Sequence, residues 1–256
     1  MPAVTRVGGA APDAGVATNI TTNTTWTAAE SPYVIVRTVV QVRLNSTLTI
    51  EPGATVKFEP GRAIEVEAGS SIVANGTAGS NIVFTSNSLS PAVGDWLHVG
   101  VSGSSGSSFS YCVFEYARQG LSLSLSNPPV ERCTFHACQI GLQLVRSSPA
   151  VTTCGIVDCT SSGIQCQYRE TRPLIYDCSI SNPGYNIYLL DYLSPLVSID
   201  ATHNWWGTDD PLTIASKIYD KFDSGSLFGE VDYAEYYSAP GVEPASWGSI
   251  KALFRE

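Results

Sequence analysis

The sequence predicts an all-β protein whose chain winds into a parallel β-solenoid, with one coil for each short internal repeat. The segments PPVERCTFHACQIGLQL (128–144) and PAVTTCGIVDCTSSGIQC (149–166) carry Pro, Val, Cys and Gly in the same order. The same periodicity places cysteines at Cys112, Cys133, Cys154 and Cys178. No helical periodicity separates the repeats. They are therefore too short for the crossovers of an ordinary parallel sheet and must wind into stacked coils.

Each repeat holds two apolar pairs with the alternation of a β-strand, so both members of a pair should face the core. The first pairs are Cys112 and Phe114, Cys133 and Phe135, Cys154 and Ile156, and Cys178 and Ile180. The second pairs follow a column of small or turn-forming residues, Gly120, Gly141, Gly163 and Asn186. Because Gly and Asn tolerate positive φ, this column predicts a sharp corner in every coil. The periodic cysteines predict a buried ladder of free thiols.

The N-terminal half follows the same rule with a shorter spacing. LTIEPGATVKF (48–58) and IEVEAGSSIVA (64–74) align with each other, which matches Glu51 with Glu67 and Gly53 with Gly69. Residues 33–206 should then make roughly eight coils, a rod of about 35–40 Å at the spacing of neighbouring β-strands.

Caps are expected at both ends, because a solenoid exposes unpaired strand edges there. The Thr-rich segment 19–36 suits an opening strand. At the other end, residues 208–223 predict a helix with Asp210 at its N-cap and Pro211 in its first turn. The apolar face of this helix should consist of Leu212, Ile214, Ile218 and Phe222.

The composition predicts one globular domain and excludes two classes of partner. Of 256 residues, 43% are hydrophobic and only 14% are charged, so the chain can bury a large core. The net charge of −9 repels nucleic acid. No apolar run approaches the roughly 20 residues of a membrane span, so we expect no membrane insertion. We expect a monomer organised as a linker or remnant (1–18), a solenoid with its caps (19–240) and a tail with a possible short helix (241–256).

Several phrases of the chain resemble those of a known superfamily. TLTIEPGATVKF, GTAGSNIVFTSN, GDW, CTFHACQIGLQL and HNWWGTDDP, spread over about residues 33–240, are similar to the right-handed parallel β-helix proteins of the pectate-lyase-like fold. The likeness extends to extracellular and cell-surface bacterial and archaeal β-helix repeat proteins, a group that includes periplasmic copper-site maturation proteins. It implies a right-handed β-helix and an extracellular or cell-surface location. It is weak for activity, since this fold carries lyases, hydrolases, epimerases, adhesins and inert spacers.

A polar and aromatic column on the outer wall is the candidate ligand site. Ser122, Gln143, Gln165 and Tyr188 recur at one outward position, and Tyr168, Tyr185 and Tyr192 lie in nearby turns. Amides and tyrosines suit a polysaccharide or cell-surface glycan of neutral charge, because tyrosine offers an apolar face and a hydroxyl. The predicted binding residues are Gln143, Gln165, Tyr188 and Tyr168, and the alternative is an ordinary polar solenoid face.

Catalysis on the outer face is the alternative function. A glycoside hydrolase needs two carboxyl groups about 5–10 Å apart, and Asp158 and Asp177 are the candidates on the repeats. Their different positions relative to the coil cysteines favour solvated turn residues instead. A lyase would need a cationic base, yet no lysine lies between Lys57 and Lys217 and the arginines between them do not recur at one position. Glu115, His98 and His136 are interpreted as surface or turn residues.

A metal site is not predicted. Asp209 and Asp210 in HNWWGTDDP offer two carboxylates for Ca²⁺, the one cofactor left open. Asp210 is, however, better explained as the N-cap of the helix. The sequence therefore predicts an extracellular structural or carbohydrate-binding module without catalysis, with a polysaccharide lyase or glycoside hydrolase as the alternative.

Overall fold

The computed structural model describes residues 15–237, and its strands form three parallel sheets. We call them the first, second and third sheet, in the order in which the chain visits them. The first sheet has nine strands: β1 (Thr24–Trp26), β4 (Thr47–Ile50), β7 (Ser71–Asn75), β10 (Ser108–Ser110), β13 (Val130–Glu131), β16 (Ala150–Thr152), β19 (Leu174–Tyr176), β22 (Val197–Asp200) and β24 (Gly229–Asp232).

The second and third sheets complete each coil. The second sheet has seven strands: β2 (Tyr33–Ile35), β5 (Thr55–Phe58), β8 (Ile82–Ser86), β11 (Cys112–Glu115), β14 (Thr134–His136), β17 (Gly155–Val157) and β20 (Ser179–Ser181). The third sheet has eight: β3 (Val39–Val42), β6 (Ala63–Val66), β9 (Val99–Ser102), β12 (Gln119–Ser124), β15 (Ile140–Val145), β18 (Ser162–Gln167), β21 (Tyr185–Leu190) and β23 (Ile218–Tyr219).

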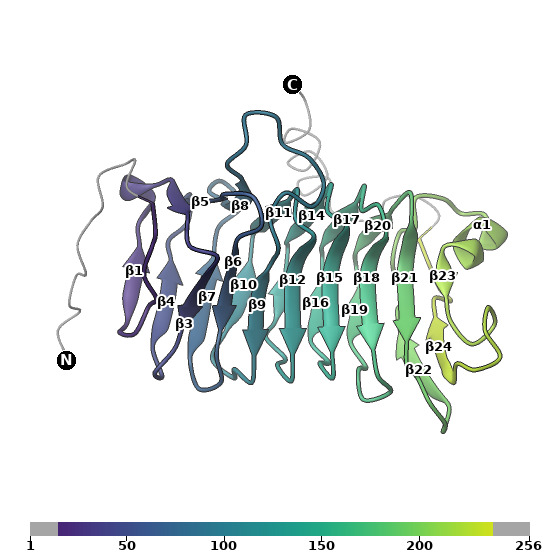
Figure 1. Cartoon of the computed structure of the whole chain (residues 1–256). Coiled ribbons are helices and arrows are strands. Elements are labelled where there is room, and N and C mark those ends of the chain that lie inside the picture. Colours follow the sequence, from purple (N-terminus) through teal and green to yellow (C-terminus); the bar gives the residue numbers. More distant parts are fainter. Residues whose placement is uncertain (1–14, 238–256) are drawn as a thin grey trace.

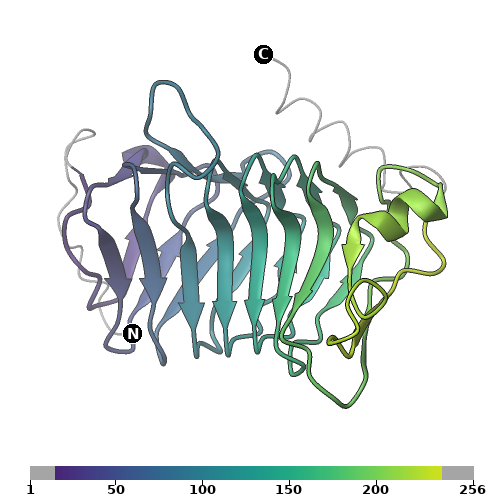
Figure 2. The ribbon, with the colours of Figure 1, turned by 45° about the vertical axis from the view of Figure 1, so that its right-hand side comes forward.

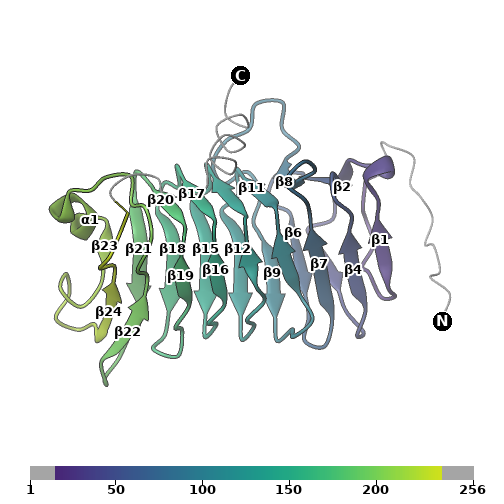
Figure 3. The ribbon, with the colours of Figure 1, turned by 180° about the vertical axis from the view of Figure 1, so that it is seen from behind.

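The chain passes through the three sheets in turn, so each strand lies beside its counterpart in the next coil (Figures 1 and 3). Sheets of nine, seven and eight strands agree with the roughly eight coils that the sequence predicts. The predicted parallel β-solenoid is therefore confirmed. The loop between β8 and β9 projects from the coils (Figure 1), and its Leu89 is fully exposed.

The thiol ladder is also confirmed, since all seven cysteines are free and buried. The backbone N–H of Cys154 lies 3.4 Å from the Sγ of Cys178, one coil further on. Each of these two thiols also reaches back to a carbonyl of an earlier coil: Cys154 donates to Val130 at 3.5 Å, and Cys178 donates to Val151 at 3.5 Å. The thiols thus act as small apolar groups that also satisfy backbone acceptors.

A second ladder of large apolar side chains fills the core inside the second sheet. The rings of Phe84, Phe114 and Phe135 stack with centroids 4.7 and 5.0 Å apart, close to the spacing of neighbouring strands. Paired register continues the ladder through Ile156 and Ile180. All these side chains are buried, so this ladder forms part of one continuous core.

The sequence analysis predicted that the glycine column forms corners with positive φ, and this prediction is wrong. Gly120, Gly141 and Gly163 lie inside third-sheet strands and do not have positive φ. A Cβ on Gly141 would lie only 2.7 Å from the carbonyl oxygen of Gly163. The three glycines of the column are therefore needed because backbone of the next coil packs closely against them. The positive φ falls on other residues, among them those just before the ladder cysteines: Tyr111, Arg132, Thr153 and Asp177.

The predicted alignment of the N-terminal repeats is also corrected. Leu48 pairs with Ile72 rather than with Ile64, so each N-terminal coil holds three strand-and-turn units. The turns between these units share one feature, a glycine with positive φ, found at Gly53, Gly61 and Gly69. The sequence alignment matched strands of different sheets, because the short unit of strand and turn looks alike in all three.

The C-terminal cap is shorter than predicted. Helix α1 (Pro211–Ser216) has Asp210 as its N-cap, and the Asp210 side chain accepts the N–H of Thr213 at 3.0 Å. The chain then turns into β23, so Ile218 is buried as a strand residue while Leu212 and Phe222 are 79% and 82% exposed. Figure 2 shows α1 and the last strands together at this end of the rod. The predicted tail, 241–256, lies outside the described residues.

Candidate ligand-binding face

The outward column predicted from the repeats lies in register on the third sheet. Paired strands place Ser122 beside Gln143, Gln143 beside Gln165, and Gln165 beside Tyr188. The same register extends the column in both directions, to Tyr219 at the C-terminal end and to Gly100, Glu65 and Gln41 at the N-terminal end. We call this column the third-sheet face.

Its middle is a chain of hydrogen-bonded polar side chains. The Ser122 hydroxyl donates to Gln143 Oε1 at 3.2 Å, and Gln143 Nε2 donates to Gln165 Oε1 at 2.9 Å. These contacts hold the amides in fixed orientations. Within the described part of the chain, no group accepts a hydrogen bond from Gln165 Nε2. The face therefore presents an ordered amide with an open donor.

Its C-terminal end is a cluster of three tyrosines. Tyr188 and Tyr219 stack with their ring centroids 4.6 Å apart and their planes 10° apart. Tyr185 lies against both, at 5.3 and 5.6 Å. Burial raises the pKa of Tyr188, with smaller contributions from the charges of Tyr219 and Tyr185. The Tyr188 phenol thus stays protonated near neutral pH and can both donate and accept hydrogen bonds.

A histidine–carboxylate pair lies near the N-terminal end of the third-sheet face. His98 Nε2 is 2.5 Å from Glu65 Oε1, and both side chains are partly exposed. A Cβ on Gly100 would lie 2.1 Å from the Glu65 carboxylate, so the Glu65 side chain in this orientation lies directly over Gly100. Sequence reasoning treated His98 as a surface residue and did not foresee the pair, because the two residues lie far apart in the chain.

Tyr168 lies at the edge of the face rather than on it. It follows β18 at a corner with positive φ, one residue after the outward Gln167. The guanidinium of Arg146 lies 4.2 Å from the centre of its ring. Tyr192 is fully buried and donates its hydroxyl to the carbonyl of Thr171, so it is not available on the surface.

The two carboxylates proposed for catalysis lie at opposite ends of second-sheet strands. Asp158 follows β17 and donates its backbone N–H to Ser181 at 3.3 Å, whereas Asp177 precedes β20. Asp177 also accepts the hydroxyl of Tyr237 at 2.6 Å. Asp158 instead lies 3.5 Å from His136 Nε2. The structure therefore does not bring Asp158 and Asp177 together across a groove.

The two aspartates proposed for Ca²⁺ have separate surroundings. Asp210 Oδ2 accepts hydrogen bonds from the backbone and hydroxyl of Thr213, and these bonds lower the pKa of Asp210. Asp209 accepts the hydroxyl of Tyr236 through its backbone carbonyl at 3.2 Å. Among residues 15–237, no group of three or more His, Cys, Asp or Glu side chains has a geometry that could hold a metal ion.

Tyr219 is one of the residues of the third-sheet face that sequence reasoning missed, as are Glu65 and Gln41. Tyr219 does not follow Tyr188 at the spacing of the earlier repeats. It also falls inside the helix predicted over residues 208–223. The lysines and aspartates around it suit a helix as well as a short strand. The signal for a strand was that Tyr219 continues the outward column of Gln143, Gln165 and Tyr188 with a second tyrosine.

The coils, ladders and outer column together define a parallel β-helix repeat protein. Residues 18–108 match a family model described as a pectate-lyase-like β-helix domain. This match fits a carbohydrate-related β-helix and agrees with the resemblance found in the sequence. Searches of curated proteins and of solved structures gave no match. Within residues 15–237, no helix has the length and apolar character to cross a membrane.

Proposed function

We propose that the protein is a non-catalytic carbohydrate-binding module that works outside the cell, and that it binds neutral glycans along the third-sheet face. The observation that carries the proposal is the unbroken register from Ser122 through Gln143, Gln165 and Tyr188 to Tyr219. Its groups repeat at the spacing of the coils, about 4.8 Å. A polysaccharide laid along the rod would therefore meet similar groups at regular intervals.

The chemistry of the face supports a neutral ligand. It consists mainly of amides, hydroxyls and aromatic rings, which hydrogen bond to sugar hydroxyls and contact the apolar faces of sugar rings. Its one charged group between Gln41 and Tyr219, Glu65, is already paired with His98. Rigid groups also favour binding, because the amide chain and the stacked tyrosines lose little freedom when a ligand arrives.

An array of neutral oligosaccharides tests the proposal, followed by affinity measurements with soluble β-glucan, xylan and mannan. We expect binding to at least one class, weakened by Gln165→Ala. The control is Thr152→Ala, which alters a part-buried polar side chain on the first sheet. Absence of binding to every glycan, or equal loss in the two variants, would contradict the proposal.

One observation favours the enzymatic alternative. The Glu65–His98 pair joins a carboxylate to an imidazole on the same face, and such pairs serve general acid–base catalysis. The test is incubation with each bound polysaccharide, with assays for new reducing ends and for unsaturated products. Turnover that Glu65→Gln abolishes would establish an enzyme, whereas intact polysaccharide after long incubation supports a binding module.

A further inference from the structure

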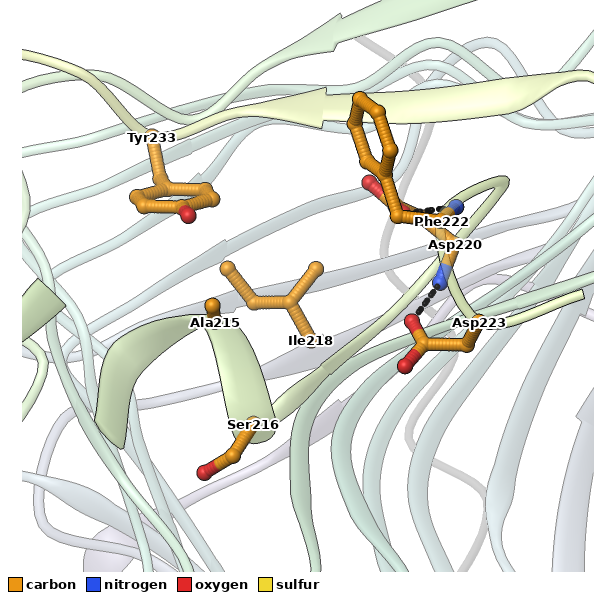
Figure 4. Close-up of a pocket in the computed structure, with 7 residues that line it drawn as sticks. All are labelled: Ala215, Ser216, Ile218, Asp220, Phe222, Asp223 and Tyr233. Carbon is orange, nitrogen blue, oxygen red and sulfur yellow. Dashed lines mark hydrogen bonds between the residues drawn. The ribbon is translucent and has the colours of Figure 1, made fainter. Parts of the chain in front are cut away.

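A small cavity lies at the C-terminal end of the rod, beside β23, where Ile218 and Asp220 on either side of Tyr219 line it. Its volume is about 200 Å³, and it is open to solvent on one side. The lining residues come from α1, β23, the turn that follows β23 and the segment after β24; they are Ala215, Ser216, Ile218, Asp220, Phe222, Asp223 and Tyr233. Figure 4 shows Tyr233 on one side, Phe222 and the two aspartates on the other, and Ile218 between them.

The aromatic walls of this cavity are placed to receive a cation. The Phe222 side chain is 82% exposed, so its ring is not used to fill the core. Lys221 Nζ lies 4.8 Å from the centre of that ring, within the range of a cation–π contact. The Tyr233 ring forms the opposite wall and contacts Trp206 edge-on, with centroids 6.4 Å apart.

Asp220 and Asp223 form an acidic wall of the cavity, and hydrogen bonds to the backbone hold both carboxylates in place. Asp220 is 4% exposed and accepts the backbone N–H groups of Phe222 at 2.9 Å and Val231 at 3.0 Å. Asp223 in turn accepts the N–H of Asp220 at 3.0 Å. Burial raises the pKa of Asp220, and the nearby charge of Asp223 acts in the same direction. A cation in the cavity would stabilise both carboxylates.

No lysine or arginine is among the residues that line the cavity. The neighbouring Lys221 is paired with Glu230. Two aromatic rings, two carboxylates and the apolar floor of Ile218 therefore surround a space too small for an oligosaccharide. Organic ammonium ions bind in such surroundings, because the alkyl groups contact rings while the charge faces carboxylates.

We propose that this cavity binds a small alkylated ammonium ion, held between Phe222 and Tyr233 with its charge beside Asp220 and Asp223. This site is independent of glycan binding on the third-sheet face. The two ligands would contact different side chains, since neither Tyr219 nor Tyr188 lines the cavity, so loss of one activity leaves the other intact.

The test uses the full chain and two probes of the same shape, choline and its uncharged carbon analogue 3,3-dimethylbutan-1-ol. Binding is followed by calorimetry and by the tryptophan fluorescence of the chain, to which Trp206 contributes beside Tyr233. We expect choline to bind about tenfold more tightly than the analogue, the ratio expected if charge and cation–π contact drive binding. Equal affinity for the two probes, or no choline binding at all, would overturn the proposal.

Matched variants separate this site from general electrostatic attraction. Asp223→Asn keeps an oxygen that can accept the Asp220 N–H but removes the charge, and should weaken choline binding about fivefold or more. Asp232→Asn removes an exposed charge at the same end, on β24 and outside the cavity lining. It should leave choline affinity unchanged. Equal weakening in both variants would show that only net charge matters.

Discussion

Asn204 occupies the position that the next ladder cysteine would take after Cys178. Its Oδ1 accepts the backbone N–H of Cys178 at 2.8 Å, and its Nδ2 donates to the carbonyl of Ile175 at 2.8 Å. Two further buried thiols lie one coil apart, Cys138 and Cys159, and this short column ends in the same way, because Asn182 Oδ1 accepts the N–H of Cys159 at 2.9 Å. An amide can both donate and accept, so it replaces backbone partners that a further regular coil would have supplied.

Replacing this amide should destabilise the C-terminal end. Asn204 is fully buried, and Asn204→Ala leaves a buried N–H and a buried carbonyl without their partners. We expect a loss of about 2–4 kcal/mol in the free energy of unfolding, measured by urea denaturation. Asn75→Ala removes an exposed asparagine from β7 and should cost less than about 0.5 kcal/mol. A loss at Asn204 no larger than at Asn75 would contradict this role.

The thiols should be protected as long as the coils remain stacked. All seven are buried, and burial raises the pKa of Cys159 and Cys166 to about 12, so reactive thiolate is scarce. A colourimetric thiol reagent at pH 8 should label none of the seven in the folded protein. All seven should react in concentrated guanidinium. Rapid labelling of any cysteine without denaturant would show that the ladder is open or misplaced.

Stability should fall as the solution becomes alkaline. The pKa of Cys166 is about 12 in the folded protein against 9.0 for the free group, so the folded state holds its proton more tightly. The stability that this raised pKa contributes is fully present below pH 9. It declines above pH 9, because the thiol of the unfolded chain loses its proton at a lower pH than that of the folded protein. Each such thiol should lower the free energy of unfolding by about 1.4 kcal/mol per pH unit there. Denaturation curves between about pH 8 and pH 10.5 measure it, and Cys166→Ala should make the decline shallower.

Close backbone packing at the glycine column predicts a strong effect of one methyl group. In Gly141→Ala, the added Cβ would lie 2.7 Å from the Gly163 carbonyl oxygen and 3.1 Å from Phe135 Cβ. We expect a loss of about 1–3 kcal/mol in stability, as for other overpacked cores, again from urea denaturation. Gly79→Ala is the matched control, because nothing lies within 4 Å of its Cβ position. Similar stability of both variants would refute the packing argument.

The winding of the chain and its core could be predicted because a solenoid repeats one environment in every coil. Cys133 and Cys154 lie in the same kind of buried apolar surroundings, so the same residue type recurs and the period becomes visible. The outward column of Gln143 and Gln165 followed from the alternation along each strand. Where the repeat is regular, the position of a residue within the repeat predicts its position in the coil.

The errors arose where one residue type serves two purposes. Glycine signals both positive φ and lack of space, and at Gly141 the second cause applies. Positive φ is instead adopted by residues such as Arg132 and Asp177, which the repeat pattern did not mark as corners. The Glu65–His98 pair and the Tyr219 stack join residues outside the regular spacing, so only the folded chain brings them together.

The most direct test of the central claim compares two tyrosines on different sheets. Tyr188 lies on the third-sheet face, and Tyr176 is an exposed tyrosine of β19 on the first sheet. Affinity electrophoresis in gels that contain β-glucan, xylan or mannan measures binding of each alanine variant. We predict that Tyr188→Ala weakens binding about tenfold while Tyr176→Ala binds like the unmodified protein. Unchanged binding by Tyr188→Ala, or equal loss in both, would contradict glycan recognition by the third-sheet face.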